Sequence, residues 1–366
     1  MSQARRAVGP GRVNLIGDHT DYNHGLALPL AVGLGVTVTF TPTGSRTLEM
    51  VSSAFDRTAT VTIPVPVPGV GPGTDPTPDS ASREPAWAGL MALEPAWARL
   101  TAAMAALCHL ETGGTLAVES TLPVGSGLSS SAAMSVALAE VFGGPDTVLD
   151  IARLCQRAEH AIGVPVGLMD PLVCAGGRAG HAVLIDFDTL DVRPVAIPPE
   201  AELVVVDSGQ RRTLRTSGYA TRVEECHAAE AAVGPLGRYR PADLDALLTS
   251  LPDPVLRCRA RHVVTECARV RDTADALEGG DLAGAGALLF ESQRSLADDF
   301  AVSTPVVDRL VADLASTPGV FGARMTGAGF GGCVVALTRP GAVDTAAWPT
   351  PAWIVRATDG TVAARS

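Results

Sequence analysis

The run LPVGSGLSSSAA at residues 122–133 constrains the fold most, because it joins an expected strand to an expected helix through a glycine- and serine-rich turn. Residues 115–121 have the pattern of a strand, and residues 131–142 have the apolar content of a helix. Gly125 and Gly127 permit positive φ and close approach of the backbone to a ligand. The serines coincide with the helix N-terminus, where unpaired N–H groups and the helix dipole favour an anion.

The chain contains no lysine, so this turn lacks the cation that phosphate loops of the Walker type place beside the phosphates. A phosphate bound here would be held by backbone N–H groups, arginine or a metal ion, and lysine Schiff-base chemistry is excluded. A serine hydroxyl can also ligate Mg²⁺. The alternative is an ordinary glycine turn with a serine cap, because short glycine motifs are weak signals on their own.

Residues 11–23 (GRVNLIGDHTDYN) concentrate hydrogen-bonding side chains in one short stretch. Such a density suits a polyhydroxylated ligand, whose hydroxyl groups need both donors and acceptors. A solvated loop with side-chain-stabilised turns is the alternative. His19 and His24 have a spacing that zinc could use, but no cysteine pair accompanies them, so we do not expect a zinc site.

Two other glycine-containing runs, and two polar residues on expected helices, are further candidates for the site. Asp170 ends the run GVPVGLMD at residues 163–170 and is expected in a fixed, partly desolvated position, as a structural cap or a catalytic group. Glu159, on the preceding expected helix, is either a metal-facing acid or a surface charge. Residues 325–333 (MTGAGFGGC) indicate a close backbone approach to a ligand, or a tight turn. Tyr219 begins an expected helix, and the alternative to a functional role is that this is an ordinary amphipathic surface helix.

The net charge of −11 argues against a general binder of nucleic acids or anionic membranes, which needs a basic face. No stretch reaches the roughly 18 apolar residues of a membrane span. The seven cysteines are scattered, odd in number and without a C-x-x-C pair, which is typical of a reduced cytosolic protein. We therefore expect a soluble cytoplasmic protein with no nucleic-acid or membrane partner and, by default, a monomer.

Strand and helix patterns alternate irregularly along the chain, which favours an α+β fold. The proline-punctuated run at 191–200 predicts a boundary near residue 190, between domains 1–190 and 191–366. The proline- and glycine-rich residues 61–80 are expected to form a surface loop. The other expected strands lie at 26–40, 181–187, 202–207, 332–337 and 353–355, and the other expected helices at 97–110, 150–161, 218–232, 241–250, 254–277, 281–297 and 304–315.

The four runs, in this order, resemble the galactokinases, which are part of a wider family of small-molecule kinases that includes homoserine, mevalonate and phosphomevalonate kinases. The resemblance covers about residues 9–338, and residues 11–23, which look like the galactokinase sugar signature, are its specific part. It implies a two-domain kinase with its active site in the cleft between the domains. It also implies transfer of a phosphoryl group from MgATP to the C1 hydroxyl of galactose, giving galactose 1-phosphate for galactose catabolism.

The resemblance assigns roles by position. Arg12 would stabilise the transferring phosphoryl group, and Asp170 would face the C1 hydroxyl, as a base or as an orienting group. The remaining assignments are sugar binding by Asp18, His19, Thr20, Asp21 and Tyr219, ATP binding by Gly125, Ser126, Gly127, Leu128, Ser129, Ser130 and Ser131, and Mg²⁺ binding by Ser131 and Glu159.

This sequence departs from the family pattern at two positions, since the family usually has Glu where this chain has Asp18 and Gln where it has Pro171. Both departures bear on which sugar the protein accepts. Two alternatives therefore stay open: a kinase of the same fold for another sugar, such as N-acetylgalactosamine or arabinose, and a non-catalytic sugar sensor. Such sensors lack part of the Ser-Ala run, whereas residues 129–133 are intact here.

Overall fold

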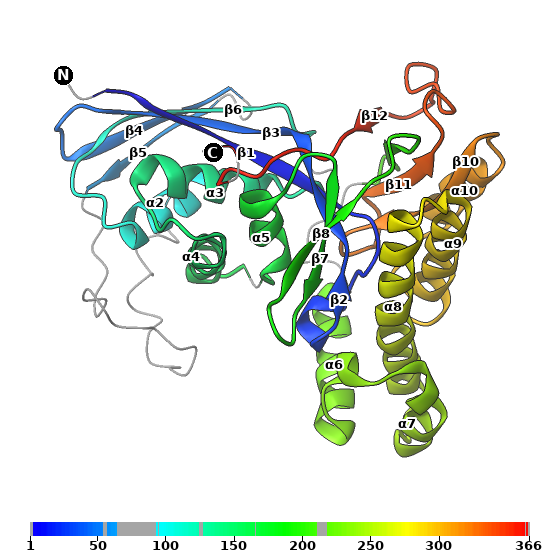
Figure 1. Cartoon of the computed structure of the whole chain (residues 1–366). Helices are drawn as coiled ribbons and strands as arrows, with labels where there is room; N and C mark the ends of the chain where they lie inside the picture. The colour runs from blue at the N-terminus through cyan, green and yellow to red at the C-terminus, as the bar shows by residue number, and fades with distance from the viewer. Residues whose placement is uncertain are drawn as a thin grey trace.

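The computed structural model describes residues 3–53, 57–63, 93, 95–123, 127–164, 166–210, 218–362 and 364. Its elements form an N-terminal half and a C-terminal half, each with its own sheet and helices (Figure 1). Gly125 and Ser126, two of the expected phosphate-binding residues, and most of the loop expected at 61–80 lie outside the described residues.

The N-terminal half is a five-stranded sheet with helices on one face (Figure 1). Its strand order is β1-β3-β6-β4-β5, and every pair is antiparallel except β4 with β6. Helices α2, α3 and α5 contact the sheet, and α4 packs against these helices. The elements are β1 (Arg5–Asn14), β3 (Pro29–Pro42), β4 (Thr47–Ser52), β5 (Arg57–Thr62), β6 (Gly114–Ser120), α2 (Ala96–Leu107), α3 (Ser130–Phe142), α4 (Val148–Ala161) and α5 (Met169–Gly176).

The C-terminal half is built on a four-stranded antiparallel sheet of order β10-β11-β9-β12. Helices α9 and α10 pack on this sheet, and α8 packs on α9 and contacts α6 and α7. The elements are β9 (Glu202–Asp207), β10 (Val320–Thr326), β11 (Cys333–Thr338), β12 (Ala352–Val355), α6 (Tyr219–Val233), α7 (Leu244–Ser250), α8 (Pro254–Glu278), α9 (Leu282–Asp298) and α10 (Pro305–Ala315), with short 3₁₀ turns at Leu236–Arg238 and Pro241–Asp243.

A small antiparallel sheet joins the halves, formed by β2 (Leu26–Ala27), β7 (His181–Asp186) and β8 (Val192–Ala196). Its first strand contacts α8 of the other half. The chain end returns to the N-terminal half (Figure 1), where the Thr361 hydroxyl donates to the Val8 carbonyl at 2.9 Å. The largest apolar core cluster contains residues of both halves. The boundary near residue 190 stays a prediction, and it lies in the turn between β7 and β8.

Close packing of α3 on β1 positions the functional residues. A Cβ at Gly9 would lie 1.9 Å from the Ala133 carbonyl oxygen, so only glycine permits this approach. The α3 helix is almost entirely buried as a result. The turn before it also lies on β1, because the Arg12 amide donates to the Leu128 carbonyl at 3.1 Å. The N-terminus of α3 is thereby fixed beside the end of β1.

Most of the expected elements are confirmed, and three differ in detail. The helix expected over 241–250 is a 3₁₀ turn at Pro241–Asp243 followed by α7, which begins at Leu244. The strand expected over residues 26–40 is divided into β2 and β3, because the Leu28 amide bonds to Ile16 and the two pieces join different sheets. The helix expected over 97–110 ends at Leu107. Strands β1, β4, β5, β8 and β10 were not predicted.

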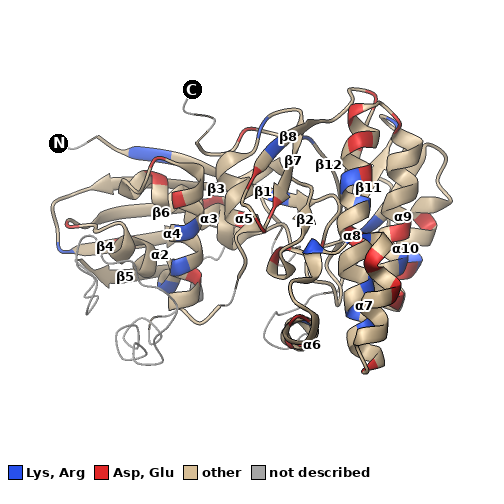
Figure 2. Cartoon of the chain, turned by 60° about the horizontal axis from the view of Figure 1, so that its bottom comes forward, with Lys and Arg blue, Asp and Glu red and all other residues tan. Residues whose placement is uncertain are grey.

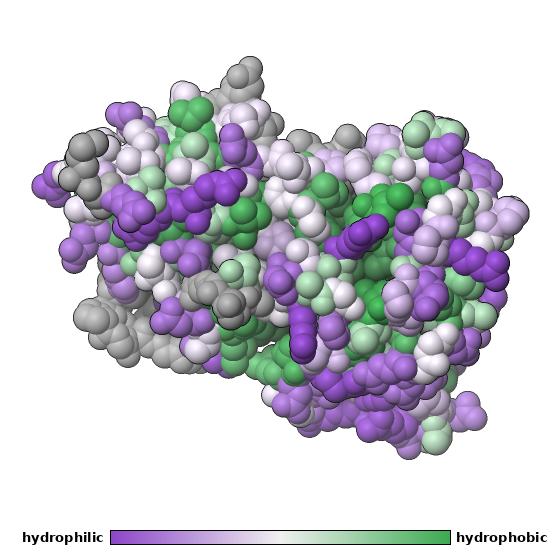
Figure 3. Space-filling view, turned by 45° about the horizontal axis from the view of Figure 1, so that its top comes forward, coloured by the Kyte–Doolittle hydropathy of each residue, from purple (hydrophilic) through white to green (hydrophobic). Residues whose placement is uncertain are grey.

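The surface mixes charges and apolar groups. Acidic and basic residues both occur along α8, α9 and α10 (Figure 2), and hydrophilic and hydrophobic residues are interspersed on the face shown in Figure 3. Among the described residues the exposed large apolar side chains come from five separate elements: Val8, Val51, Val192, Val255 and Ile354. Within the described part of the chain, no helix is long and apolar enough to span a bilayer.

Candidate active site

A cleft of about 320 Å³ lies where the end of β1, the loop after it, the N-termini of α3 and α5, and two segments of the C-terminal half meet. It brings together most of the residues that the sequence pointed to. Those that line it are Arg12, Asp18, His19, Asp21, Gly127, Leu128, Ser129, Ser130, Ser131, Glu159, Asp170 and Tyr219. Thr20 does not line the cleft.

Arg12 and Asp170, which both line the cleft, form a bidentate ion pair. Arg12 Nε donates to Asp170 Oδ1 at 2.6 Å and Nη2 donates to Oδ2 at 2.7 Å. The third nitrogen, Nη1, donates to the Gly127 carbonyl at 2.6 Å. Burial disfavours the charged guanidinium, but the Asp170 carboxylate outweighs this and raises the pKa of Arg12. Arg12 therefore stays charged while it holds both the catalytic candidate and the turn before α3.

The turn before α3 gives Asp170 a further donor. Ser129, the residue preceding α3, has φ 60° and ψ 50°, a left-handed conformation that costs energy for a residue other than glycine. Its hydroxyl donates to Asp170 Oδ2. A Cβ at Gly11 would lie 2.8 Å from the Leu128 carbonyl oxygen, so β1 supports this turn directly. Three donors therefore fix the Asp170 carboxylate, which is still 28% exposed to the cleft.

Ser131 and Glu159 form the candidate metal site. The hydroxyl of Ser131, in the first turn of α3, donates to the Glu159 carboxylate near the end of α4. Burial raises the pKa of Glu159, and the Ser131 hydrogen bond offsets part of that shift. Two such oxygen ligands fit Mg²⁺, which usually binds one or two protein groups together with waters and phosphate oxygens. The described residues hold no cluster of three or more His, Cys, Asp or Glu suited to a metal. A metal ion here would therefore need further oxygen ligands from water and from a bound phosphate.

His19, Asp21 and Tyr219 form the opposite wall. Burial, with the charge of Asp170, raises the pKa of Asp21 to about 6. The His19 ring lies 5.8 Å from the Tyr219 ring and 4.6 Å from the Phe300 ring. Its Nδ1 is 2.9 Å from the hydroxyl of Tyr22. This wall combines aromatic faces with a carboxylate, which suits a sugar.

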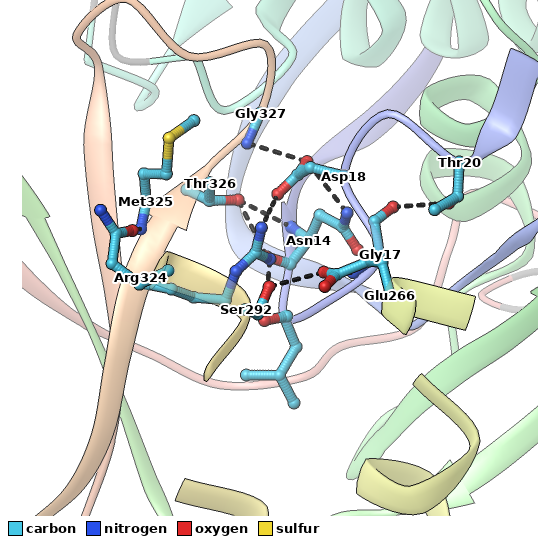
Figure 4. Close-up of polar contacts among 12 residues, drawn as sticks. Asn14, Gly17, Asp18, Thr20, Glu266, Ser292, Arg324, Met325, Thr326 and Gly327 are labelled. Atoms are coloured by element: carbon cyan, nitrogen blue, oxygen red, sulfur yellow. Dashed lines mark hydrogen bonds and ion pairs between the residues drawn. The ribbon is translucent and has the colours of Figure 1, made fainter. Parts of the chain in front are cut away.

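Asp18 and Thr20 are engaged within the protein (Figure 4). The Asp18 carboxylate is 3% exposed and accepts from Asn14, from the Gly327 amide and from Arg324. Thr20 is fully buried, and its hydroxyl lies within hydrogen-bond distance of the Gly17 and Leu26 carbonyls, at 2.9 and 2.7 Å. Sugar binding by Thr20 stays a prediction, and its side chain hydrogen-bonds within its own loop.

Sequence reasoning missed Arg324, which is fully buried in β10. The sequence contained one signal, because a charged residue inside the otherwise apolar strand VFGARMT needs a partner. That partner, Asp18, is 306 positions away and could not be identified locally. Gly327 and Ala328, from the run at 325–333, also line the cleft.

Sequence models of three families match this chain: the galactokinase galactose-binding signature over residues 2–42, the N-terminal domain of the GHMP kinases over 96–178, and the C-terminal GHMP kinase domain over 273–347. The chain is 38% identical to a galactokinase of Roseiflexus sp. (strain RS-1), covering 92% of this chain and 84% of the relative. It is 36% identical to a galactokinase of Bos taurus (91% and 83% covered) and 40% identical to one of Mycobacterium tuberculosis (90% and 87%).

Solved structures show the same likeness. A galactokinase of Lactococcus lactis complexed with galactose superposes with a TM-score of 0.85 at 25% identity, covering 98% of this chain and 95% of the other. A mevalonate kinase superposes with a TM-score of 0.64 at 16% identity, covering 98% and 100%, and so shares the fold alone. The expected two-domain α+β kinase fold is confirmed.

Proposed function

Because the chain belongs to the galactokinase family, we propose that this protein transfers the terminal phosphoryl group of ATP to the C1 hydroxyl of galactose. The observation that carries the proposal is the Asp170 carboxylate, held by Arg12 between a candidate phosphate site and a candidate sugar wall. Phosphoryl transfer needs mainly this kind of positioning and charge neutralisation.

The N-terminus of α3 would hold the ATP phosphates. Its free backbone N–H groups and its dipole favour an anion, and Arg12 supplies the side-chain cation in a chain without lysine. Ser131 and Glu159 would ligate Mg²⁺. When bound, Mg²⁺ neutralises charge on the transferring phosphoryl group.

His19, Asp21 and Tyr219 would bind the sugar. The ionised Asp21 carboxylate accepts hydrogen bonds from hydroxyl groups, and the aromatic rings pack against the apolar face of a pyranose. A buried polar group that loses its hydroxyl partner is costly, so this wall would discriminate between sugars.

Asp170 would orient the C1 hydroxyl and take up its proton. Its bidentate contact with Arg12 fixes the orientation of the carboxylate in the cleft. A purely orienting role fits the same geometry. We propose that the protein acts in this way in the cytoplasm, as a monomer with galactose and MgATP as its only partners.

A coupled assay of ADP release with galactose, N-acetylgalactosamine, arabinose and no sugar tests the function. We expect sugar-dependent ADP release with galactose and at least tenfold lower kcat/KM with the other two sugars, because their altered substituents leave polar groups unpaired. Higher kcat/KM with another sugar would reassign the substrate. No release with any sugar, with galactose still binding, would favour a sugar sensor.

A further inference from the structure

We propose that Asp18 is a positioning residue, which together with Arg324 locks the loop after β1 to the glycine-rich turn after β10, and that it is not a direct ligand of the sugar. The inference rests on the proposed function, because the sugar wall carried by this loop is what the lock would position. It concerns the one residue of the sugar signature that departs from the family pattern.

The protein itself occupies most of the Asp18 carboxylate. Asn14 Nδ2 donates to Oδ1 at 3.0 Å, the Gly327 amide donates to the same oxygen at 3.1 Å, and Arg324 Nη2 donates to Oδ2. A carboxylate has about four acceptor positions, so at most about one remains. Asp18 borders the cleft but is only 3% exposed, whereas a carboxylate that binds several sugar hydroxyls has to present free acceptor positions to the cleft.

Arg324 faces the loop from a fully buried position in β10 (Figure 4). Its Nη1 donates to the Leu15 carbonyl at 3.1 Å, in addition to the ion pair with Asp18. Beside it, the Thr326 hydroxyl donates to the Asn14 carbonyl at 2.9 Å and lies 3.1 Å from the Asn14 amide. The runs at 11–23 and 325–333 are therefore joined by a continuous set of hydrogen bonds, although about 310 positions separate them.

Glu266 of α8 holds the same loop from the other side. Its carboxylate accepts from the Gly17 amide at 3.0 Å and from the Ser292 hydroxyl of α9 at 2.6 Å. Burial alone would raise the pKa of Glu266, but Arg269, His262 and Arg324 outweigh it and lower that pKa to about 2. The buried charges thus compensate one another, and the loop is fixed at Gly17 and at Asp18.

The lock ends next to the groups that would meet the sugar. His19 follows Asp18 directly, Asp21 lies three positions after Asp18, and Gly327 begins the turn that also lines the cleft. A shift of Asp18 would move the candidate sugar wall relative to the turn that begins at Gly327. The shorter aspartate suits this role. Asn14 and the Gly327 amide both donate to Oδ1 at the reach of an aspartate side chain, and a glutamate carboxylate would lie one methylene further from the backbone.

Deoxy sugars distinguish a positioning residue from a ligand. We would measure kcat/KM of the parent, Asp18→Asn and Asp21→Asn proteins with galactose and with its 2-, 3-, 4- and 6-deoxy derivatives. For Asp18→Asn we expect kcat/KM to fall by the same factor, about tenfold, with every sugar, because no single hydroxyl is its partner. Asp21→Asn, the matched control, should lose most of its effect with the one derivative that lacks its partner. Loss of the Asp18→Asn effect with one derivative would overturn the proposal.

Variants of Arg324 provide a second test of the proposal. Arg324→Met leaves Asp18 unpaired and should raise the KM for galactose at least tenfold, whereas the KM for MgATP changes less than threefold. The double variant Asp18→Asn/Arg324→Met removes both charges and should recover part of the lost galactose affinity. If the double variant is as impaired as the sum of the two changes, the lock does not exist. If Arg324→Met does not fold, Arg324→Lys is used, which keeps the charge but lacks the fork that reaches both Asp18 and the Leu15 carbonyl, and it should raise the KM for galactose by a smaller factor.

The parent protein separates the two proposals. If it does not phosphorylate galactose, the proposed function fails, and the same cycle is then run on the rise in melting temperature that each sugar produces. If it does phosphorylate galactose and the Asp18→Asn effect depends on one hydroxyl, only the positioning role fails.

Discussion

Replacement of Asp170 by asparagine tests the centre of the site. Both oxygens of Asp170 accept from Arg12, and Oδ2 also accepts from Ser129. An amide group in the same place has one oxygen and one NH₂. In either orientation its NH₂ faces a guanidinium N–H, so one of the two bonds to Arg12 is replaced by a donor–donor contact, and the charge that balances the guanidinium is lost.

The magnitude follows from this geometry. Breaking a fully buried ion pair costs about 3–5 kcal/mol. Because Asp170 is 28% exposed, we expect the free energy of unfolding to fall by roughly 2 kcal/mol. Loss of a positioned proton acceptor typically lowers kcat by about 10²–10⁴-fold, and the misplaced Arg12 adds to this. The affinity for MgATP should change little, because the N-terminus of α3 and the Ser131–Glu159 pair are untouched.

The assay is steady-state ADP release with galactose, combined with a nucleotide titration and urea unfolding. Asp188→Asn is the matched control, because Asp188 also pairs with an arginine and does not line the cleft. Arg238 Nε contacts both of its oxygens, at 3.0 and 2.9 Å, and Nη2 donates to Oδ1 at 2.7 Å. The kcat of Asp188→Asn should stay within twofold of the parent. If Asp170→Asn retains more than about a third of the parental kcat, Asp170 is neither the base nor the orienting group.

Four further outcomes are expected. Because the pKa of Asp21 is raised to about 6, kcat/KM for galactose should fall as the pH drops below about 6, and Asp21→Asn should lack this limb; a limb that persists in the variant belongs to another group. The same shift means that stability falls as pH rises from about 4 to 6, since the folded protein binds this proton more tightly, and urea unfolding of parent and variant measures the difference. Glu159→Gln should weaken the apparent affinity for Mg²⁺ about tenfold in a titration at fixed ATP with the KM for galactose unchanged, and an unaltered Mg²⁺ titration would remove Glu159 from the metal site. Gly9→Ala should lower the free energy of unfolding by about 3 kcal/mol, because its Cβ would overlap the Ala133 carbonyl; a neutral effect would mean that β1 and α3 can separate without loss.

The sequence predicted the elements that carry strong local signals. Helices such as α8 and α9 begin after the capping residues Asp253 and Asp281 and keep an apolar face, so their periodicity sufficed. Strand β1 escaped prediction because RRAVGPGRVN contains a proline and two glycines, which normally indicate a turn. It is a strand because β3 pairs with it and because Gly9 admits α3.

The candidate site was partly predictable for the same reason. The motifs identified Arg12, Asp170 and the α3 N-terminus, which a short run of sequence specifies. The hydrogen bonds and ion pairs that place these residues join positions far apart in the chain, such as Asp18 and Arg324. A buried charge indicates that a partner exists, but only the packing of β10 against the loop after β1 determines which residue it is.

Phosphorus NMR of the product formed from galactose and MgATP tests the central claim most directly. We expect one sugar phosphate whose phosphorus signal is coupled to the anomeric proton, formed in equal amount with ADP. Asp170→Asn should reduce its rate of formation by at least about a hundredfold. A phosphate on another carbon, or ADP and inorganic phosphate without a sugar phosphate, would contradict the proposed transfer to the C1 hydroxyl.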